Sequence, residues 1–311
     1  MAQETPTAEK KLVKNRSEIL FLYDITDANP NGDPLDENKP RIDEETGINI
    51  VTDVRLKRTI RDYLHDYKKL DIFIIETKDD KGDLRTKEDR LGDFKTSEDL
   101  LNKCIDIRLF GATTAVEKKT MALTGPVQFK YGRSLHKVDS IYIKGTTVMP
   151  SKADKKQGTF TEKYMLPYSL IAFYGIVNEN AALTQALKLT EEDIILMLEG
   201  IWNGTKNLIS GSKFGQMPRL LMQVIYKNEN FYIGELEKRM TLVSDINGER
   251  IRNISEVKID ITNLVKSLND YKGKIEKIKL KVDERISFIK DNKDCSIKDA
   301  LNGLSIEDLI L

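Results

Sequence analysis

The sequence has 311 residues, of which 40% are hydrophobic and 32% charged, a balance typical of globular proteins with a charged surface. It has no run of about 18 apolar residues, which excludes an ordinary membrane-spanning helix. The polar N-terminus lacks the apolar centre of a signal peptide, and two cysteines are too few for a disulfide framework or a cysteine-built zinc site. We therefore expect a cytoplasmic protein whose residues 1–16 form a flexible tail.

The 50 basic and 50 acidic side chains cancel, but they are unevenly distributed along the chain. Residues 71–100 hold 10 acidic and 6 basic side chains, a net charge of −4, whereas residues 101–170 hold 12 basic and 5 acidic ones, a net charge of +7. Opposite poles of this kind allow one surface to bind a nucleic acid or a neighbouring copy while another stays hydrated. Charge also fluctuates along any sequence, so this pattern alone does not decide the function.

The N-terminal part begins with a strand pattern and continues into a long loop. Residues 17–26 (SEILFLYDIT) form an apolar run typical of a buried strand. Residues 27–47 are rich in Asn, Asp, Gly and Pro, which favours a loop. Thr52 is a good N-cap for a helix that we expect to reach Lys69, because its apolar residues fall on one stripe. Residues 71–76 (DIFIIE) then resemble a short strand.

The middle of the chain alternates exposed and buried patterns. Residues 77–99 are acidic and predict an exposed insertion, and a helix with Ser97 as its N-cap should follow. The pattern of residues 111–124 looks irregular, whereas residues 125–130 have β character. Residues 145–162 contain Pro, two Gly and several Lys, which predicts a protruding hairpin or a mobile loop.

The C-terminal half contains a buried strand, a helix and another strand. Residues 164–177 are apolar and aromatic, and residues 220–226 resemble a strand. Between them, Thr190 opens a helix with a capping-box-like start, and Gly204 should end that helix. Residues 250–311 are charged and only intermittently amphipathic, so we expect a C-terminal extension of unknown role packed on the core.

These elements predict an α+β fold of the ferredoxin-like or RRM-like type, because strands alternate with segregated helices. Residues 17–249 would form one core carrying the insertions at 77–99 and 145–162.

The first loop superficially resembles a calcium site. Asp27, Asn29 and Asn31 have the spacing of the first three ligands of an EF-hand loop, and Gly32 follows. However, Asn38 stands where the bidentate Glu should be, and a strand precedes the loop instead of a helix. A rigid turn built from hydrogen bonds between side chains and backbone explains this loop better. We expect neither a metal nor a cofactor.

No nucleophile motif, phosphate-binding loop or zinc-protease motif is present. The two histidines, His65 and His136, lie in basic surroundings that do not favour catalysis over a surface role. An acid-driven ribonuclease that uses Asp27 or Asp33 stays open, because general acid–base chemistry depends on geometry.

RNA binding has more support, because basic side chains lie near aromatic ones in several segments. Cations follow a phosphate backbone and aromatic rings stack on bases, a combination that binds single strands with little sequence preference. Each segment taken singly is as typical of a hydrated helix face, a core aromatic or a surface loop. The candidates are Lys57, Arg58 and Arg61 of the first helix, Lys130 and Arg133, then Met149, Lys152 and Phe160 of the hairpin, and Ser212 and Lys213 of a Gly-flanked loop.

A set of longer motifs resembles a known family. The chain reads DITDANPNGD at residues 24–33, KPRID at 39–43 and VTDVRLKR at 51–58. This succession resembles the backbone, repeat-associated subunit family of type I CRISPR Cascade complexes, and most of all its subtype I-B members. Further matches, which together extend over roughly residues 17–226, are RLFG at 108–111, TGPVQ at 124–128, Arg133-Ser134, the segment 164–168 and FGQMP at 214–218.

The resemblance implies an RRM-like palm with fingers, web and thumb insertions, and a thumb at residues 145–162. It implies a non-enzymatic subunit that stacks in several copies as a helical filament along a CRISPR RNA in antiviral defence. The guide would pair with target DNA, and further Cascade subunits would be partners. Phosphate contacts would lie on Lys57, Arg58, Arg61, Arg133 and Ser134, with the loop 211–216 as a further candidate.

Two alternatives remain. Related backbone subunits of type III complexes cut RNA with an aspartate in the loop after the first strand, and Asp27 or Asp33 has a comparable position here. The chain would also fit a generic single-strand RNA-binding protein outside any CRISPR complex. The acidic insertion 77–99 is a candidate contact with the basic face of a neighbouring copy.

Overall fold

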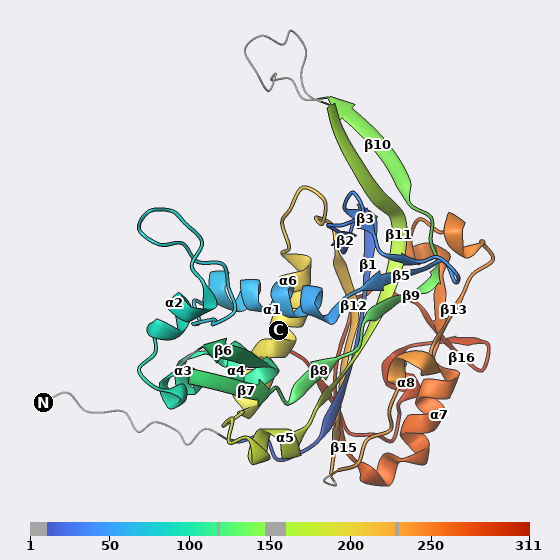
Figure 1. The fold of residues 1–311 in the computed structure, drawn as a ribbon. Helices are drawn as coiled ribbons and strands as arrows, with labels where there is room; N and C mark the ends of the chain where they lie inside the picture. The colour runs from blue at the N-terminus through green and yellow to red at the C-terminus, as the bar shows by residue number, and fades with distance from the viewer. Residues whose placement is uncertain (1–10, 117–118, 147–159, 228–229) are drawn as a thin grey trace, which may run out of the picture.

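The computed structural model describes residues 11–116, 119–146, 160–227 and 230–311 (Figure 1). A ten-stranded sheet passes through the centre of the molecule. Its strands are β1 (Ser17–Ala28), β4 (Ile42–Asp43), β5 (Ile48–Val51), β8 (Val127–Phe129), β9 (Gly132–Lys137), β10 (Ile141–Thr146), β11 (Phe160–Val177), β12 (Met217–Tyr226), β15 (Ile275–Val282) and β18 (Ile306–Asp308). They lie in the order β18–β15–β12–β1–β11–β9–β5–β4, and β8 and β10 also pair with β11.

The central strand β1 is covered on both faces. It pairs antiparallel with β11 on one side and with β12 on the other. Because successive side chains of a strand point to opposite faces, Ile19 and Phe21 enter one core while Leu20 and Leu22 enter a second core on the other face. The continuous apolar run that predicts this strand follows from burial on both faces.

Helices α1 (Asp53–Asp66) and α6 (Glu191–Lys206) cover one face of the sheet (Figure 1). Thr52 caps α1, and Thr190 opens α6 in a capping box with Asp193, as the sequence predicts. The prediction that Gly204 ends α6 was wrong. Gly204 lies inside the helix, where a Cβ atom would come within 3.0 Å of Tyr63 on α1, so this glycine allows the two helices to pack closely.

Residues 230–311 cover the opposite face of the sheet (Figure 1). Leu264 and Ile278 of this segment pack into the second core, and β15 extends the central sheet beside β12. The charged stretch 250–311 is therefore structured, and its short amphipathic segments form short strands and helices. These are β13 (Thr241–Val243), β14 (Lys258–Asp260), α7 (Thr262–Asp270), β16 (Phe288–Lys290), β17 (Lys293–Cys295) and α8 (Ile297–Ala300), besides β15 and β18.

An insertion between α1 and β8 has a small core of its own. Leu91, Phe94 and Cys104 are buried in it, so residues 77–99 are not wholly exposed as expected. The predicted strand at 71–76 is absent, and residues 111–116 pair antiparallel with residues 119–124 instead of being irregular. The elements of this insertion are α2 (Lys87–Gly92), α3 (Ser97–Lys103), α4 (Ile105–Phe110), β6 (Gly111–Val116) and β7 (Lys119–Thr124).

Two further segments depart from the expectations. The predicted hairpin at 145–162 has longer arms, because β10 pairs with β11 from Ile141, and the pair projects beyond the sheet (Figure 1). Residues 11–16 are fixed rather than flexible. Val13 is buried in the first core, and Arg16 forms a buried ion pair of 2.8 Å with Glu179 in α5 (Glu179–Thr184).

Candidate nucleic-acid interface

Three segments meet at one end of α1. The loop after β1 binds the start of the helix, because Oδ1 of Asn31 accepts hydrogen bonds from the backbone N of Thr52 at 2.8 Å and from its Oγ1 at 2.9 Å. The same loop binds the segment before β12, because the backbone N of Asn29 donates to the carbonyl of Ser212 at 2.7 Å. The loop also forms a small ribbon of its own from β2 (Gly32–Asp33) and β3 (Lys39–Pro40). The first loop is thus a rigid connector, as its turn residues predict.

Two cations lie near each other at this junction. Arg55 lies in the first turns of α1 and donates to Oγ1 of Thr59 at 3.0 Å. Burial lowers the pKa of Lys213, and the charge of Arg55 lowers it further. Burial also lowers the pKa of Arg55. Within the described ranges neither side chain forms an ion pair with a carboxylate, although the charge of Asp62 partly offsets the effect of burial on the pKa of Arg55. An anion placed between them would relieve this repulsion, and a phosphate is such an anion.

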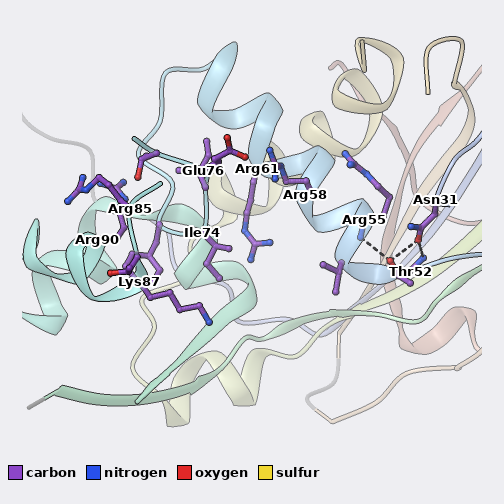
Figure 2. Close-up of a pocket in the computed structure, with 15 residues that line it drawn as sticks. Asn31, Thr52, Arg55, Arg58, Arg61, Ile74, Glu76, Arg85, Lys87 and Arg90 are labelled. Atoms are coloured by element: carbon purple, nitrogen blue, oxygen red, sulfur yellow. Dashed lines mark hydrogen bonds between the residues drawn. The ribbon is translucent and has the colours of Figure 1, made fainter. Parts of the chain in front are cut away.

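An arginine-rich cleft adjoins the junction. It has a volume of about 440 Å³ and separates α1 from the insertion. Figure 2 shows Arg55, Arg58 and Arg61 from α1 on one side, and Arg85, Lys87 and Arg90 from the insertion on the other, with Ile74 and Glu76 between them. The sequence does not reveal this arrangement, because residues 77–99 are net acidic and their basic side chains approach α1 only in the folded chain.

The three cations predicted on α1 have different surroundings. Arg58 is about half exposed, with a side-chain exposure of 47%, and its Nε lies 2.6 Å from Asp62 one turn away. Nζ of Lys57 lies 3.0 Å from Asp53 on the side of the helix that faces Phe110. Arg61, the third predicted phosphate contact, is not free on the surface.

Arg61 is buried, with a side-chain exposure of 8%, and its Nε donates to Oδ2 of Asp106 at 3.1 Å. Asp106 also accepts from the backbone N of Phe73 and of Ile74. The helical spacing places Arg61 near Arg58, but the insertion folds over it. The ion pair between Arg61 and Asp106 therefore holds the insertion against α1.

The candidates on β9 and near β8 lie away from the junction. Arg133 is 55% exposed and only loosely paired with Asp43 at 3.5 Å. Lys130 is paired with Glu235 and Glu237 at 3.0 and 3.2 Å. The prediction that Ser134 contacts phosphate needs correction, because this residue is buried. Its Oγ accepts a hydrogen bond from the backbone N of Asn49 and donates one to the carbonyl of His136.

Two of the three hairpin candidates, Met149 and Lys152, lie outside the described residues. Phe160 is the first residue of β11, and only its backbone is described. The roles of these three residues stay predictions.

The residues considered for catalysis do not gather. Asp27 is exposed at the end of β1, with a φ of 48°. Oδ2 of Asp33 lies 2.6 Å from NH1 of Arg41 in an ion pair. Burial lowers the pKa of His136, whose Nε2 accepts from the backbone N of Leu170. Over the residues that the structure describes, no group of three or more His, Cys, Asp or Glu could hold a metal ion.

One functional candidate escaped the sequence interpretation although its signal was present. Arg55 precedes Arg58 by three residues, so the two lie on the same face of α1. Arg55 becomes a candidate only because Lys213 lies near it in the fold. Lys213 is 158 residues away in the chain (213 − 55), so no periodicity of the sequence connects the two.

Among the described helices none is both long and apolar enough to cross a membrane.

The chain has clear relatives. A family model described as CRISPR-associated protein Cas7 matches residues 15–262. A protein of Haloferax volcanii named CRISPR-associated protein Cas7 is 34% identical over 306 residues, which covers 88% of each chain.

Solved structures share the fold at low sequence identity. A chain of a structure titled CRISPR RNA-guided surveillance complex matches with a TM-score of 0.54 at 15% identity, and the match covers 94% of both chains. A chain of a second structure, of such a complex in a pre-nicking state, matches with a TM-score of 0.58 at 13% identity over 94% of this chain and 96% of that one. The mixed α+β fold with a central sheet is therefore that of these complex subunits. From the family model and the haloarchaeal relative, the chain belongs to the CRISPR-associated protein Cas7 family.

Proposed function

We propose that this chain is the CRISPR-RNA-binding backbone subunit of a type I Cascade complex, present in several copies along one guide. The single observation that carries the proposal beyond family membership is the pair Arg55 and Lys213, two half-buried cations that form no ion pair in the described ranges, at the junction where the first loop binds both the start of α1 and the segment before β12. Base pairing between guide and target reads the sequence in such complexes, so the protein needs only to hold the backbone and impose a shape.

The palm of this subunit would be RRM-like. The central strands lie in the antiparallel order β12–β1–β11–β9, with α1 following β1 and α6 following β11, which supports a ferredoxin-like arrangement. The projecting pair β10–β11 would be the base of the thumb, and the insertion 72–124 would be the fingers. The motifs in the first loop and on α1 favour subtype I-B.

The guide would cross the junction at the start of α1 and continue past Arg58 and Arg133, the most exposed of the predicted cations in the described part of the chain. Copies would join head to tail, because a filament requires an interface that does not close into a ring. The exposed acidic residues around Asp79 and Asp83 on the insertion are candidate contacts with a neighbour. Other Cascade subunits would bind the ends of the row, and target DNA would bind through the guide.

Native mass spectrometry of complexes assembled on guides of different length tests this proposal. If copies line the guide, the number bound rises stepwise as the guide is lengthened by a fixed increment. The same number of bound copies on guides of all lengths would contradict the proposal.

We further propose that the chain is not a nuclease. Of the two candidate carboxylates, that of Asp33 is engaged in an ion pair with Arg41, and in the described part of the chain no cluster of acidic side chains around Asp27 could hold a metal ion. The competing function, guide-directed RNA cleavage, is tested with a complementary RNA and divalent metal ions. Cleavage by the wild type that disappears in Asp27→Ala or Asp33→Ala would establish the ribonuclease instead.

A further inference from the structure

We propose that the cleft between α1 and the insertion is a nucleotide site, in which the arginines hold a phosphate and the apolar side chains hold the attached base. The inference rests on the proposed function in one respect, that the chain binds nucleic acid. It assigns a place to one nucleotide beside the junction, in a cleft that shares Arg55 with the junction but is not lined by Lys213.

The size and composition of the cleft fit such a unit. Its volume of about 440 Å³ falls within the range of small-molecule sites, roughly 300 to 1,000 Å³. Six of its lining residues are Arg or Lys, and Glu76 is the one acidic residue among the lining residues described. A cleft with cations on both walls favours an anion, and the planar guanidinium groups match the oxygens of a phosphate.

The charges in the cleft are only partly neutralised. Arg85 and Arg90 share the carboxylate of Asp93, at 2.7 Å each, so two positive charges face one negative charge. In the described part of the chain Lys87 has no ion-pair partner. The buried Nε atoms of Arg55 and Arg90 also lack hydrogen-bond acceptors there. The walls therefore retain positive charge and unused donor capacity for a ligand.

An apolar surface lies between the charged walls. Val54 on α1 is 65% exposed and Ile74 on the insertion is 39% exposed, although both are aliphatic. Both line the cleft, as does the buried Phe73. Aliphatic side chains and guanidinium planes provide flat contacts for a base, and stacking of this kind is tolerant of base identity. An inorganic phosphate alone would leave this apolar surface uncovered, which favours a whole nucleotide.

The cleft is also held in shape by hydrogen bonds that join its two walls and fix its floor. Asp106 binds Arg61 and the backbone of Phe73 and Ile74 from behind, and NH2 of Arg90 donates to the carbonyl of Ile72 at 2.8 Å. The wall that carries Ile74 is thereby fixed relative to α1. The site is built before a ligand arrives, so binding needs little rearrangement of the backbone.

Photo-crosslinking in the assembled ribonucleoprotein tests the proposal. A benzoylphenylalanine replaces Ile74 in one variant and Leu84 in a second. Leu84 is the matched control, because it is an exposed leucine of the same insertion, at 64% exposure, that does not line the cleft. The guide RNA and a complementary DNA strand carry different labels, so the crosslinked strand is identified.

The proposal predicts a crosslink from position 74 to a nucleotide of one strand at a yield at least fivefold above that from position 84. A crosslink to the guide RNA would identify the guide as the source of the nucleotide, and a crosslink to the DNA strand would identify the target. Equal yields at the two positions, or a crosslink from position 74 only to protein, would overturn the nucleotide site while the bound guide leaves the proposed function intact. Absence of guide RNA from the wild-type particle would overturn both.

Substitution of Lys87 provides a second measurement that does not depend on the crosslinker. Lys87→Glu should reduce the crosslink from position 74 at least threefold, because it places a negative charge on the wall. Lys81→Glu on the same insertion makes the same charge change outside the cleft and should leave the yield unchanged. Equal losses in the two variants would show a general charge effect and contradict a local site.

Discussion

Nε of Arg61 donates to Oδ2 of Asp106 at 3.1 Å, and both side chains are buried where the insertion meets α1. The pair joins residues 45 positions apart, and the same carboxylate receives two backbone N–H groups of residues 73 and 74. One buried acid thus fixes both the helix and one wall of the arginine-rich cleft.

Asp106→Ala should destabilise the fold strongly, because it leaves a buried guanidinium and two backbone donors without partners. Loss of one partner of a buried ion pair costs roughly 3–5 kcal/mol, which should appear as a lower free energy of unfolding in urea titrations. Asp62→Ala is the control, because its pair with Arg58 is partly exposed and such pairs contribute at most about 1 kcal/mol. Similar losses in both variants would contradict the role given to Asp106.

Arg55→Ala and Lys213→Ala should each weaken the binding of guide RNA and make it less sensitive to salt. Each contact with a phosphate of a single strand contributes about 0.7 to the slope of log affinity against log salt concentration. Fluorescence anisotropy over a series of salt concentrations measures both effects. Lys81→Ala removes an exposed charge elsewhere and should leave the slope unchanged. Unchanged slopes in the first two variants would remove the phosphate site from the end of α1.

The pKa of His136 predicts a loss of stability in mild acid. Burial lowers this pKa below the ordinary value of 6.5, and the charge of Arg252 lowers it further. The unfolded chain therefore binds a proton at a higher pH than the folded one, so stability is present above about pH 6.5 and falls as the pH decreases from there toward the folded pKa.

Thermal unfolding between pH 7.5 and 5.5 checks this dependence. Protonation would place a hydrogen on Nε2, which accepts from the backbone N of Leu170. His136→Gln should be less stable than the wild type at pH 7.5 but should lose less on acidification. His65→Gln, at an exposed histidine, should follow the wild-type profile. A His136→Gln profile parallel to that of the wild type would contradict the assignment.

The C-terminal segment should be required for folding. Ile278 in β15 is fully buried in the second core, and truncation of such a residue to alanine costs roughly 2–5 kcal/mol. Ile278→Ala should accordingly lower the denaturation midpoint in urea. Ile310→Ala is the matched control, because Ile310 is 94% exposed and should change the midpoint little. If both variants unfold like the wild type, residues 250–311 are a dispensable attachment.

Local patterns predicted the elements whose signals lie within a few residues. The cap at Thr52, the capping box at Thr190 and the apolar run of β1 each appear where expected, because caps and buried strands are determined by neighbours in the chain. The prediction that Gly204 ends its helix was wrong, because the sequence around a glycine that permits close helix packing does not differ from that around a glycine that ends a helix. The hairpin of β6 and β7 and the short strands after residue 240 have no strong periodicity of their own.

The candidate site was harder to predict because it depends on contacts between distant segments. Arg58 could be identified from the basic face of α1, whereas Arg61 on the same face is covered by the insertion and paired with Asp106. Lys213 gains its significance from Arg55, and the arginines of residues 85–90 from the position of the insertion beside α1. Ser134 matched a family motif, but its hydroxyl is used inside the sheet.

Sequencing of the RNA that co-purifies with this protein from its own host tests the central claim most directly. The account predicts discrete species that carry spacer sequence flanked by repeat fragments, and a marked loss of these species from the Arg55→Ala, Lys213→Ala double variant purified in the same way. Random cellular fragments with the wild type, or no RNA at all, would contradict a backbone subunit bound to a guide.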